Sequence, residues 1–235
     1  MGYKLTWMYI WQQKIRPSGW QPWANTIAYW ELDWDLTDEM WNYDWTVTSN
    51  ATVSYVALPW DSSVKCAEVY SNGWSYWISL PTTICSELFT SNVDFTFWGF
   101  IKATSFSSAH EFLYLENWNS ALICLSVRDN DVFYEIKPNS DGFITINLVD
   151  DTWNSIVYSY KNSTKTLSIY VNGVFAWDKT FSQDYATWGT ASSAFLARLN
   201  NYTLMSNMVL EKNVAWDSTQ AQLFHNTFKS LYGLS

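Results

Sequence analysis

Short stretches rich in aromatic and β-branched residues, separated by polar turn clusters, run through most of the chain. They include VDFTFWGFIKAT (93–104), EFLYLEN (111–117), ALICLSV (121–127), DVFYEI (131–136) and FITINLV (143–149). Turn clusters such as RDND and PNSDG recur between them at roughly 10-residue intervals, which is typical of a β-sandwich or barrel. The pattern therefore predicts an all-β fold built from many short strands.

The strongest turn signal lies in the third quarter of the chain. The stretch SIVYSYK (155–161) alternates apolar and polar residues, and it leads through NSTK into TLSIYVNGVFAW (166–177). Asn172 and Gly173 are suited to a type I′ turn, which needs positive φ at both central positions. We therefore expect a tight β-hairpin centred on these two residues.

One helix is expected, close to the C-terminus. Asp217 or Ser218 can cap its start, and Gln220 follows Asp217 by three residues, a variant of the capping box. Gly233 can end the helix. The helix would carry one apolar stripe for packing against a sheet, formed by Ala221, Phe224, Phe228 and Leu231.

The beginning of the chain differs from the rest. KLTWMYIWQQKIRPSGWQPW reads as a small strand or hairpin followed by a connector that contains proline and glycine. We predict an N-terminal arm with its connector at 1–26 and one β-sandwich domain at 27–235. A domain of this length can bury a sizeable core.

Charge and composition narrow the class of protein. The net charge of −9 argues against nucleic-acid binding, which needs a basic surface. No apolar run approaches ~18 residues, so no membrane span is expected, and no signal peptide is evident. Cys66, Cys85 and Cys124 lie in apolar, strand-like surroundings and are expected to be buried free thiols. With only His110 and His225 present, a zinc site or a histidine-based nucleophile has little material.

Four segments, in order, resemble the laminin-G-like branch of the concanavalin A-like lectin/glucanase superfamily over about 27–232. They are AYWELDWDLTDEMWNYDWT, DFTFWGFIK with Trp98, DTWNSIVYSYKNSTKTLSIYVNGV with Trp153, and LMSNMVLEKNVAW before the terminal helix. The resemblance implies a jelly-roll sandwich of two antiparallel sheets with one short C-terminal helix. The segment MYIWQQKIRPSGWQPWANT also resembles the short arm that precedes such domains in some bacteriophage structural proteins.

The resemblance implies a non-enzymatic module that binds carbohydrate or a cell-surface receptor, on a virion or an extracellular surface. The arm would contact other virion or surface proteins. The main alternative is a structural or decorating protein without a ligand site. Exposed tryptophan and tyrosine faces could stack on sugars, but the sequence does not identify which aromatic residues are exposed.

An enzymatic alternative rests on Glu31, Asp33 and Asp35. On a strand these three carboxylates would share one face, as in glucanases that use paired acids. Asp35 is shorter than the expected glutamate, however, and the segment opens the domain and runs directly into a turn-rich loop. The sequence therefore favours a protein that is not an enzyme.

The same acidic loop offers hard oxygen ligands. Asp33, Asp35 and Asp38 are candidate calcium ligands, although the spacing is not that of an EF-hand. Solvated loop acids are the competing interpretation, so calcium is a possible cofactor and no other is expected.

Tryptophan and glycine occur in an inverted ratio, seventeen to eight. Several tryptophans interrupt loop sequences in which glycine would be ordinary: Trp34, Trp41, Trp45, Trp74 and Trp118. One hypothesis is that UGA codons for glycine were read as tryptophan. The alternative is a genuinely tryptophan-rich surface, in which non-glycine residues would occupy strained turn positions.

Overall fold

A computed structural model of the chain describes most of the predicted domain. The described residues are 24–33, 35–40, 42–47, 51–58, 61–71, 78–89, 93–107, 109–117, 120–137, 141–146, 148–184, 191–196, 198–199 and 203–234. Most of the predicted arm, residues 1–23, lies outside this set, so the arm stays a prediction.

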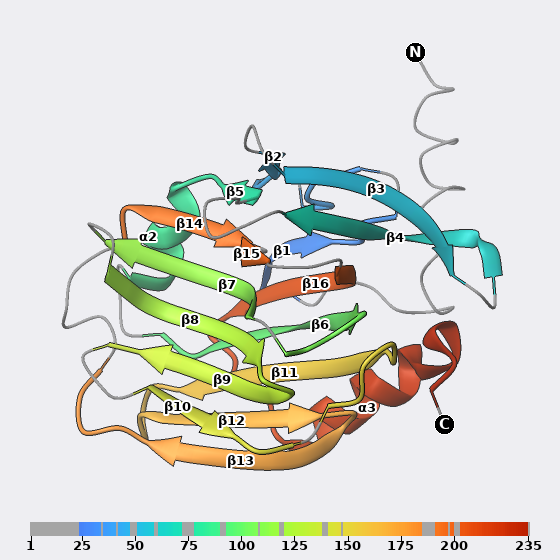
Figure 1. Cartoon of the computed structure of the whole chain (residues 1–235). Coiled ribbons are helices and arrows are strands. Elements are labelled where there is room, and N and C mark those ends of the chain that lie inside the picture. The colour runs from blue at the N-terminus through green and yellow to red at the C-terminus, as the bar shows by residue number, and fades with distance from the viewer. Residues whose placement is uncertain are drawn as a thin grey trace.

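The described strands form two antiparallel sheets. Sheet A contains β1 (Thr26–Trp30), β3 (Ala51–Leu58), β4 (Asp61–Ser71), β6 (Phe95–Ala103), β11 (Asn154–Lys161), β12 (Thr166–Val171), β13 (Val174–Thr180) and β16 (Thr203–Lys212). Their spatial order is β13-β12-β11-β6-β16-β4-β3, with β1 paired to the part of β16 that β4 does not reach (Figure 1).

Sheet B lies in front of sheet A in Figure 1. It contains β2 (Thr46–Val47), β5 (Ile78–Leu80), β7 (His110–Asn117), β8 (Ser120–Arg128), β9 (Asp131–Ile136), β10 (Asp141–Ile144), β14 (Ser193–Leu196) and β15 (Arg198–Leu199). The spatial order is β10-β9-β8-β7-β14-β5-β2, and β15 also pairs with β7. The predicted all-β sandwich of two antiparallel sheets is confirmed.

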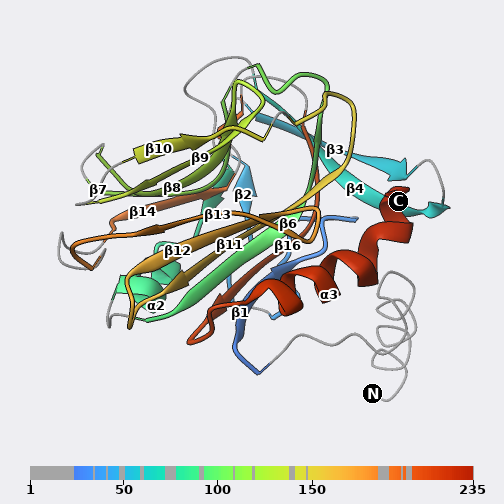
Figure 2. The same cartoon turned by 90° about the horizontal axis from the view of Figure 1, so that it is seen from below.

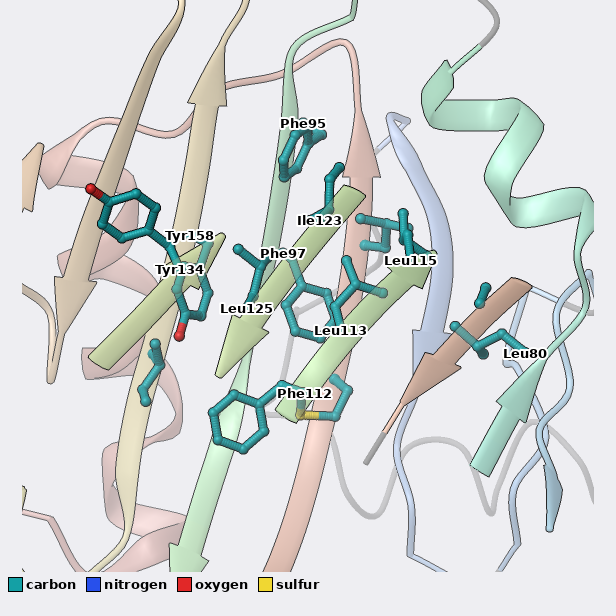
Figure 3. Close-up of a cluster of buried hydrophobic side chains, with 14 of the residues drawn as sticks. Leu80, Phe95, Phe97, Phe112, Leu113, Leu115, Ile123, Leu125, Tyr134 and Tyr158 are labelled. Atoms are coloured by element: carbon teal, nitrogen blue, oxygen red, sulfur yellow. The ribbon is translucent and has the colours of Figure 1, made fainter. Parts of the chain in front are cut away.

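The main core fills the space between the sheets. Side chains alternate along each strand, so every second residue of facing strands points inward. Figure 3 shows Phe95 and Phe97 of β6 facing Leu113 of β7 and Leu125 of β8 across this space. At about 25 cal/mol per Å² of apolar surface removed from water, these aromatic and aliphatic side chains supply the main driving force for folding.

A second apolar layer covers the outer face of sheet A. The helix α3 (Ser218–Phe228) lies along that face, on the side of the sandwich opposite to sheet B (Figure 2). Ala221, Phe224 and Phe228 of the predicted stripe are buried there, against Trp98 and Phe100 of β6. The side chain of Leu231 is not among the described ones. The stripe therefore packs against the sheet, as its spacing predicted.

The predicted capping and turn signals are confirmed. The carboxylate of Asp217 accepts the Gln220 N–H and the Gln220 side chain accepts the Asp217 N–H, which completes the capping box. The helix continues into one 3-10 turn, η2 (Lys229–Tyr232), that ends at Gly233 with φ of 64°. Asn172 and Gly173 have φ of 52° and 77°, as the β12–β13 hairpin requires.

Two local predictions were wrong. Cys85 lies in a helix, α2 (Thr83–Phe89), and not in strand-like surroundings, because Ile84, Cys85, Leu88 and Phe89 fall on one helical face and fill one end of the main core. The predicted strand 143–149 ends at Ile144, because the carboxylate of Asp131 accepts the Ile146 N–H and draws the chain away from the ladder. The three cysteines are free and buried, as predicted.

Candidate functional site

The acidic segment after β1 does not form a row of carboxylates. Strand β1 ends at Trp30, and Leu32 adopts φ of 62°, which interrupts the alternation that the enzymatic alternative needs. Glu31 is buried, Asp33 is half-buried and Asp35 is exposed. The premise that these three residues lie on one strand face was therefore wrong, since the chain has already left the extended conformation.

Asp38 organises the loop that follows. Its Oδ1 atom accepts the N–H groups of Tyr29 and Met40 at 2.7 and 3.0 Å. Its Oδ2 atom accepts those of Asn42 and Tyr43 at 3.1 and 3.0 Å. Burial raises the pKa of Asp38, and the four backbone hydrogen bonds oppose that rise. The carboxylate thus satisfies backbone N–H groups of β1 and of the loop, and so it holds the loop against β1.

The candidate calcium ligands are not brought together. Asp35 accepts the N–H and the hydroxyl of Thr37, which makes a local turn, and both oxygens of Asp38 are occupied by backbone donors. In the described ranges, no three His, Cys, Asp or Glu side chains form a group that could hold a metal ion. Calcium binding by Asp33, Asp35 and Asp38 stays a prediction without support from this geometry.

Of the five tryptophans suspected to replace glycine, Trp45 is the one that can be assessed. It is 6% exposed, and its ring centroid lies 5.5 Å from that of Trp30 in the main core. Its φ is not positive, so the backbone there does not require glycine. The buried indole N–H nevertheless has no hydrogen-bond partner among the described residues. Trp34, Trp41, Trp74 and Trp118 lie outside the described residues, and reading the codons tests the hypothesis directly.

Both histidines are used inside the fold. Nδ1 and Nε2 of His110 lie 2.7 and 2.8 Å from the Thr203 hydroxyl and the Ser105 carbonyl oxygen, and burial lowers the pKa of His110 to about 4. Nδ1 of His225 lies 3.0 Å from the hydroxyl of Ser155 beneath α3. Burial, together with the charge of Lys229, lowers the pKa of His225. These contacts indicate that both histidine side chains have structural roles.

The outer face of sheet B carries a separate aromatic cluster. Tyr114 of β7, Cys124 of β8 and Phe133 of β9 pack together, with Phe195 of β14 beside them. Their neighbours along each strand point into the main core, so these residues must point outward. In the part of the chain that the structure describes, no helix lies over this face. We call these four residues, with Phe143, the outer-face cluster.

Strand pairing places the members of the outer-face cluster side by side. Tyr114 lies opposite Cys124 on one side and opposite Phe195 on the other, and Phe133 lies opposite Phe143 of β10. The ring centroids of Phe133 and Phe143 are 4.9 Å apart, and those of Tyr114 and Phe195 are 6.5 Å apart. Phe133 is 3% exposed whereas Phe143 is 54% exposed, so Phe143 is an accessible ring on a packed aromatic base.

Charged side chains surround these rings. The guanidinium carbon of Arg128 lies 4.1 Å from the centroid of Phe133, and Nη2 of Arg128 lies 2.8 Å from Oε1 of Glu111. Beside them, Nζ of Lys137 lies 2.8 Å from Oε1 of Glu135. Burial raises the pKa of the Cys124 thiol well above its usual range, so this thiol is neutral and inert near pH 7.

This arrangement suits non-covalent recognition. A ring face is electron-rich and attracts the weakly positive C–H groups of a sugar, while fixed charged groups can donate and accept hydrogen bonds around it. The sequence already held a signal for it. In DVFYEI, Phe133 alternates with Val132 and Tyr134 and shares its face with Asp131 and Glu135, which is unusual for a core aromatic residue.

Comparisons with known proteins show the fold and no family. No family model matches the chain, and no curated protein matches it. Among solved structures, the binding domain of Paraclostridial Mosquitocidal Protein 1 matches with a TM-score of 0.67 and 13% identity, over 89% of this chain and 55% of that one. The receptor-binding domain of botulinum neurotoxin type G matches with a TM-score of 0.59 and 12% identity, over 86% and 51%.

A third similar structure is domain 4 of AbnA, an extracellular arabinanase of Geobacillus stearothermophilus, in complex with arabinotriose. It matches with a TM-score of 0.64 and 18% identity, over 86% of this chain and 98% of that domain. The chain spans about half the length of the toxin domains and nearly the whole AbnA domain. The chain therefore shares the β-sandwich fold of carbohydrate- and receptor-binding domains.

Proposed function

We propose that this protein is a non-enzymatic carbohydrate-binding module whose ligand site is the outer-face cluster of sheet B. The observation that carries the proposal is Phe143, a half-exposed ring packed at a tilt of 56° against buried Phe133 and bordered by two ion pairs. A ligand stacked on Phe143 would extend the apolar contact that begins at Phe133, and the charged groups beside it would orient that ligand.

Each part of the site would have a distinct task. Phe143 would stack on a sugar ring, and Phe133 would hold it in place from behind. Arg128 is fixed by Glu111 and by its position over the Phe133 ring, so it would present unused N–H donors to hydroxyl groups at little entropic cost. The sandwich positions these groups on strands, which are more rigid than loops.

The similar structures support the class of ligand. One of them was solved with arabinotriose, and another is described as entering cells through interaction with two ganglioside molecules. A third was solved in complex with rat synaptotagmin II, a protein receptor. We further propose that the chain belongs to the laminin-G-like branch and acts on a virion or cell surface, with residues 1–26 contacting neighbouring proteins there.

A glycan array that includes arabino-oligosaccharides tests the proposal. The matched pair of variants is Phe143→Ala in the outer-face cluster and Phe175→Ala on β13 of sheet A, whose ring is 50% exposed. We expect binding by the natural chain and by Phe175→Ala, and a loss of about 30-fold in affinity for Phe143→Ala, as for a central contact residue.

Two outcomes would contradict the proposal. If the natural chain binds no glycan on a broad array, the structural or decorating role is favoured. If the chain cleaves β-glucans and Glu31→Gln abolishes the cleavage, the protein is an enzyme and the site is elsewhere.

A further inference from the structure

The strands at the two ends of each sheet differ in how they are protected. In the described part of the chain, the edge strands of sheet B are β2, with two residues, and β10, with four. At one edge of sheet A, β13 carries the exposed charges of Asp178 and Lys179. Short or charged edge strands resist pairing with another chain.

The remaining edge, β3, lacks these protections. Its eight residues, ATVSYVAL, include no charged residue and no proline, and four are β-branched or aromatic. Thr52, Ser54, Val56 and Ala57 are exposed, and within the described residues β3 pairs with β4 alone. Figure 1 shows β3 as the outermost strand of sheet A at the top of the molecule. The backbone N–H and C=O groups on its outer edge can therefore form hydrogen bonds with a further strand.

We propose that β3 pairs antiparallel with β3 of a second copy of this chain. The regular part of the strand is Ala51–Ala57, since the ladder with β4 shifts between Ala57 and Leu58. Its central residue is Ser54. In a continuous sheet, opposite residues point to the same face, so the two-fold axis must lie between one residue and its own copy in the other chain.

An axis between the two copies of Ser54 gives favourable side-chain pairs on both faces. On the outer face, Thr52 of one copy lies opposite Val56 of the other. On the inner face, Val53 lies opposite Tyr55, and both already pack against the main core. Aromatic and β-branched pairs of this kind stabilise antiparallel strands. The strand is therefore complementary to itself, which favours a second copy over an unrelated partner.

On the outer face, the acid that contacts β3 is compatible with such pairing. Glu68 of β4 accepts a hydrogen bond from Ser54 at 2.9 Å. In the pair, two such carboxylates would be separated by three strand spacings, roughly 14 Å. This is longer than the Debye length of about 8 Å at physiological salt, so their repulsion is largely screened.

The geometry has a consequence that rests on the proposed function. An axis perpendicular to sheet A leaves both copies with sheet B on the same side of the dimer. Two outer-face clusters would then face one surface together, and simultaneous contact would raise the apparent affinity for a glycan-covered surface.

Sedimentation equilibrium of the full chain, with two double variants, tests the pairing. We expect the natural chain to form dimers at micromolar concentrations. Thr52→Lys with Val56→Lys would place two lysines opposite each other twice, and should raise the dimer Kd by about 30-fold. Thr52→Glu with Val56→Lys would place opposite charges there and should restore dimers. Within one copy, these positions are roughly 13 Å apart and do not pair with each other.

The controls separate pairing from folding and from glycan binding. Val174→Lys on β13 should leave the dimer unchanged, and all variants should keep the circular dichroism spectrum of the natural chain. A natural chain that is monomeric throughout would overturn the proposal. So would a lysine variant that dimerises normally, or a glutamate–lysine variant that dimerises as weakly as the lysine variant. None of these results depends on whether a glycan binds.

Discussion

The outer faces of the two sheets differ in what covers them. On sheet A, Trp98 and Phe100 are fully buried beneath α3, with Trp98 only 4.0 Å from Phe224 between ring centroids. On sheet B, the outer-face cluster ends in Phe143, which is half exposed. Both faces are aromatic, but in the described part of the chain a helix covers the centre of the outer face of sheet A and no helix covers that of sheet B (Figure 2). The aromatic residues beneath α3 thus stabilise the fold, whereas Phe143 on sheet B is accessible for the recognition proposed above.

The largest expected effect is on the face that α3 covers. Trp98→Ala would leave a cavity between β6 and α3 and should lower the free energy of unfolding by about 4 kcal/mol. Phe143→Ala, on the outer face of sheet B, should cost about 1 kcal/mol, because roughly half of its ring is already in water. Urea denaturation of the two variants measures this contrast, and equal losses would contradict it.

The second largest loss of stability is expected in the loop that Asp38 holds by its backbone hydrogen bonds. Asn at this position cannot accept backbone N–H groups through its amide nitrogen. Asp38→Asn should therefore lower the free energy of unfolding by about 3 kcal/mol. Thermal unfolding with Ca²⁺ and with a chelator checks the cause. The structural role predicts the same loss in both conditions, whereas a loss confined to Ca²⁺ would support the calcium prediction.

Glu211 is a buried acid beneath the face that α3 covers, beside Trp216. Burial raises its pKa from 4.5 to about 7, against hydrogen bonds from Trp216 and Thr26 that lower it. A raised pKa stabilises the protonated form, so this contribution is fully present below pH ~4.5 and is lost as the pH rises through 7. Glu211→Gln should therefore raise the free energy of unfolding by about 3 kcal/mol at pH 8 and leave it unchanged at pH 4. A variant equally stable to the natural chain at both pH values would contradict this.

The smallest expected effect concerns the start of α3. Asp217→Ala removes the capping box and should cost about 1 kcal/mol. Because α3 covers sheet A and the outer-face cluster lies on sheet B, the affinity of that cluster for glycan should not change. Affinity and thermal midpoint measured on the same preparation test both statements, and a parallel loss of binding would place the site nearer to α3.

The sequence predicts the parts of the fold that local chemistry decides. Asn172 and Gly173 specify their turn through positive φ, and Asp217 with Gln220 specifies the start of α3. It fails where tertiary contacts decide. Glu31 and Asp35 alternate as a strand would, but Leu32 turns the chain out of the extended conformation.

The candidate site was beyond sequence reasoning for a related reason. Tyr114 and Phe195 look like any other strand aromatics, and whether they are core or surface depends on which sheet α3 covers. Packing between residues far apart in the chain decides which sheet α3 covers, as between Trp98 and Phe224, which are 126 positions apart. Only the shared face of Phe133 with Asp131 and Glu135 hinted at an open aromatic surface.

The most direct test of the contrast between the faces is an NMR titration of the ¹⁵N-labelled chain with the strongest glycan from the array. We expect amide shift changes centred on β9 and β10 around Phe133 and Phe143, extending to Tyr114 and Phe195. Changes centred instead on α3, or on the β12–β13 hairpin, would show that the recognition face is not the outer face of sheet B.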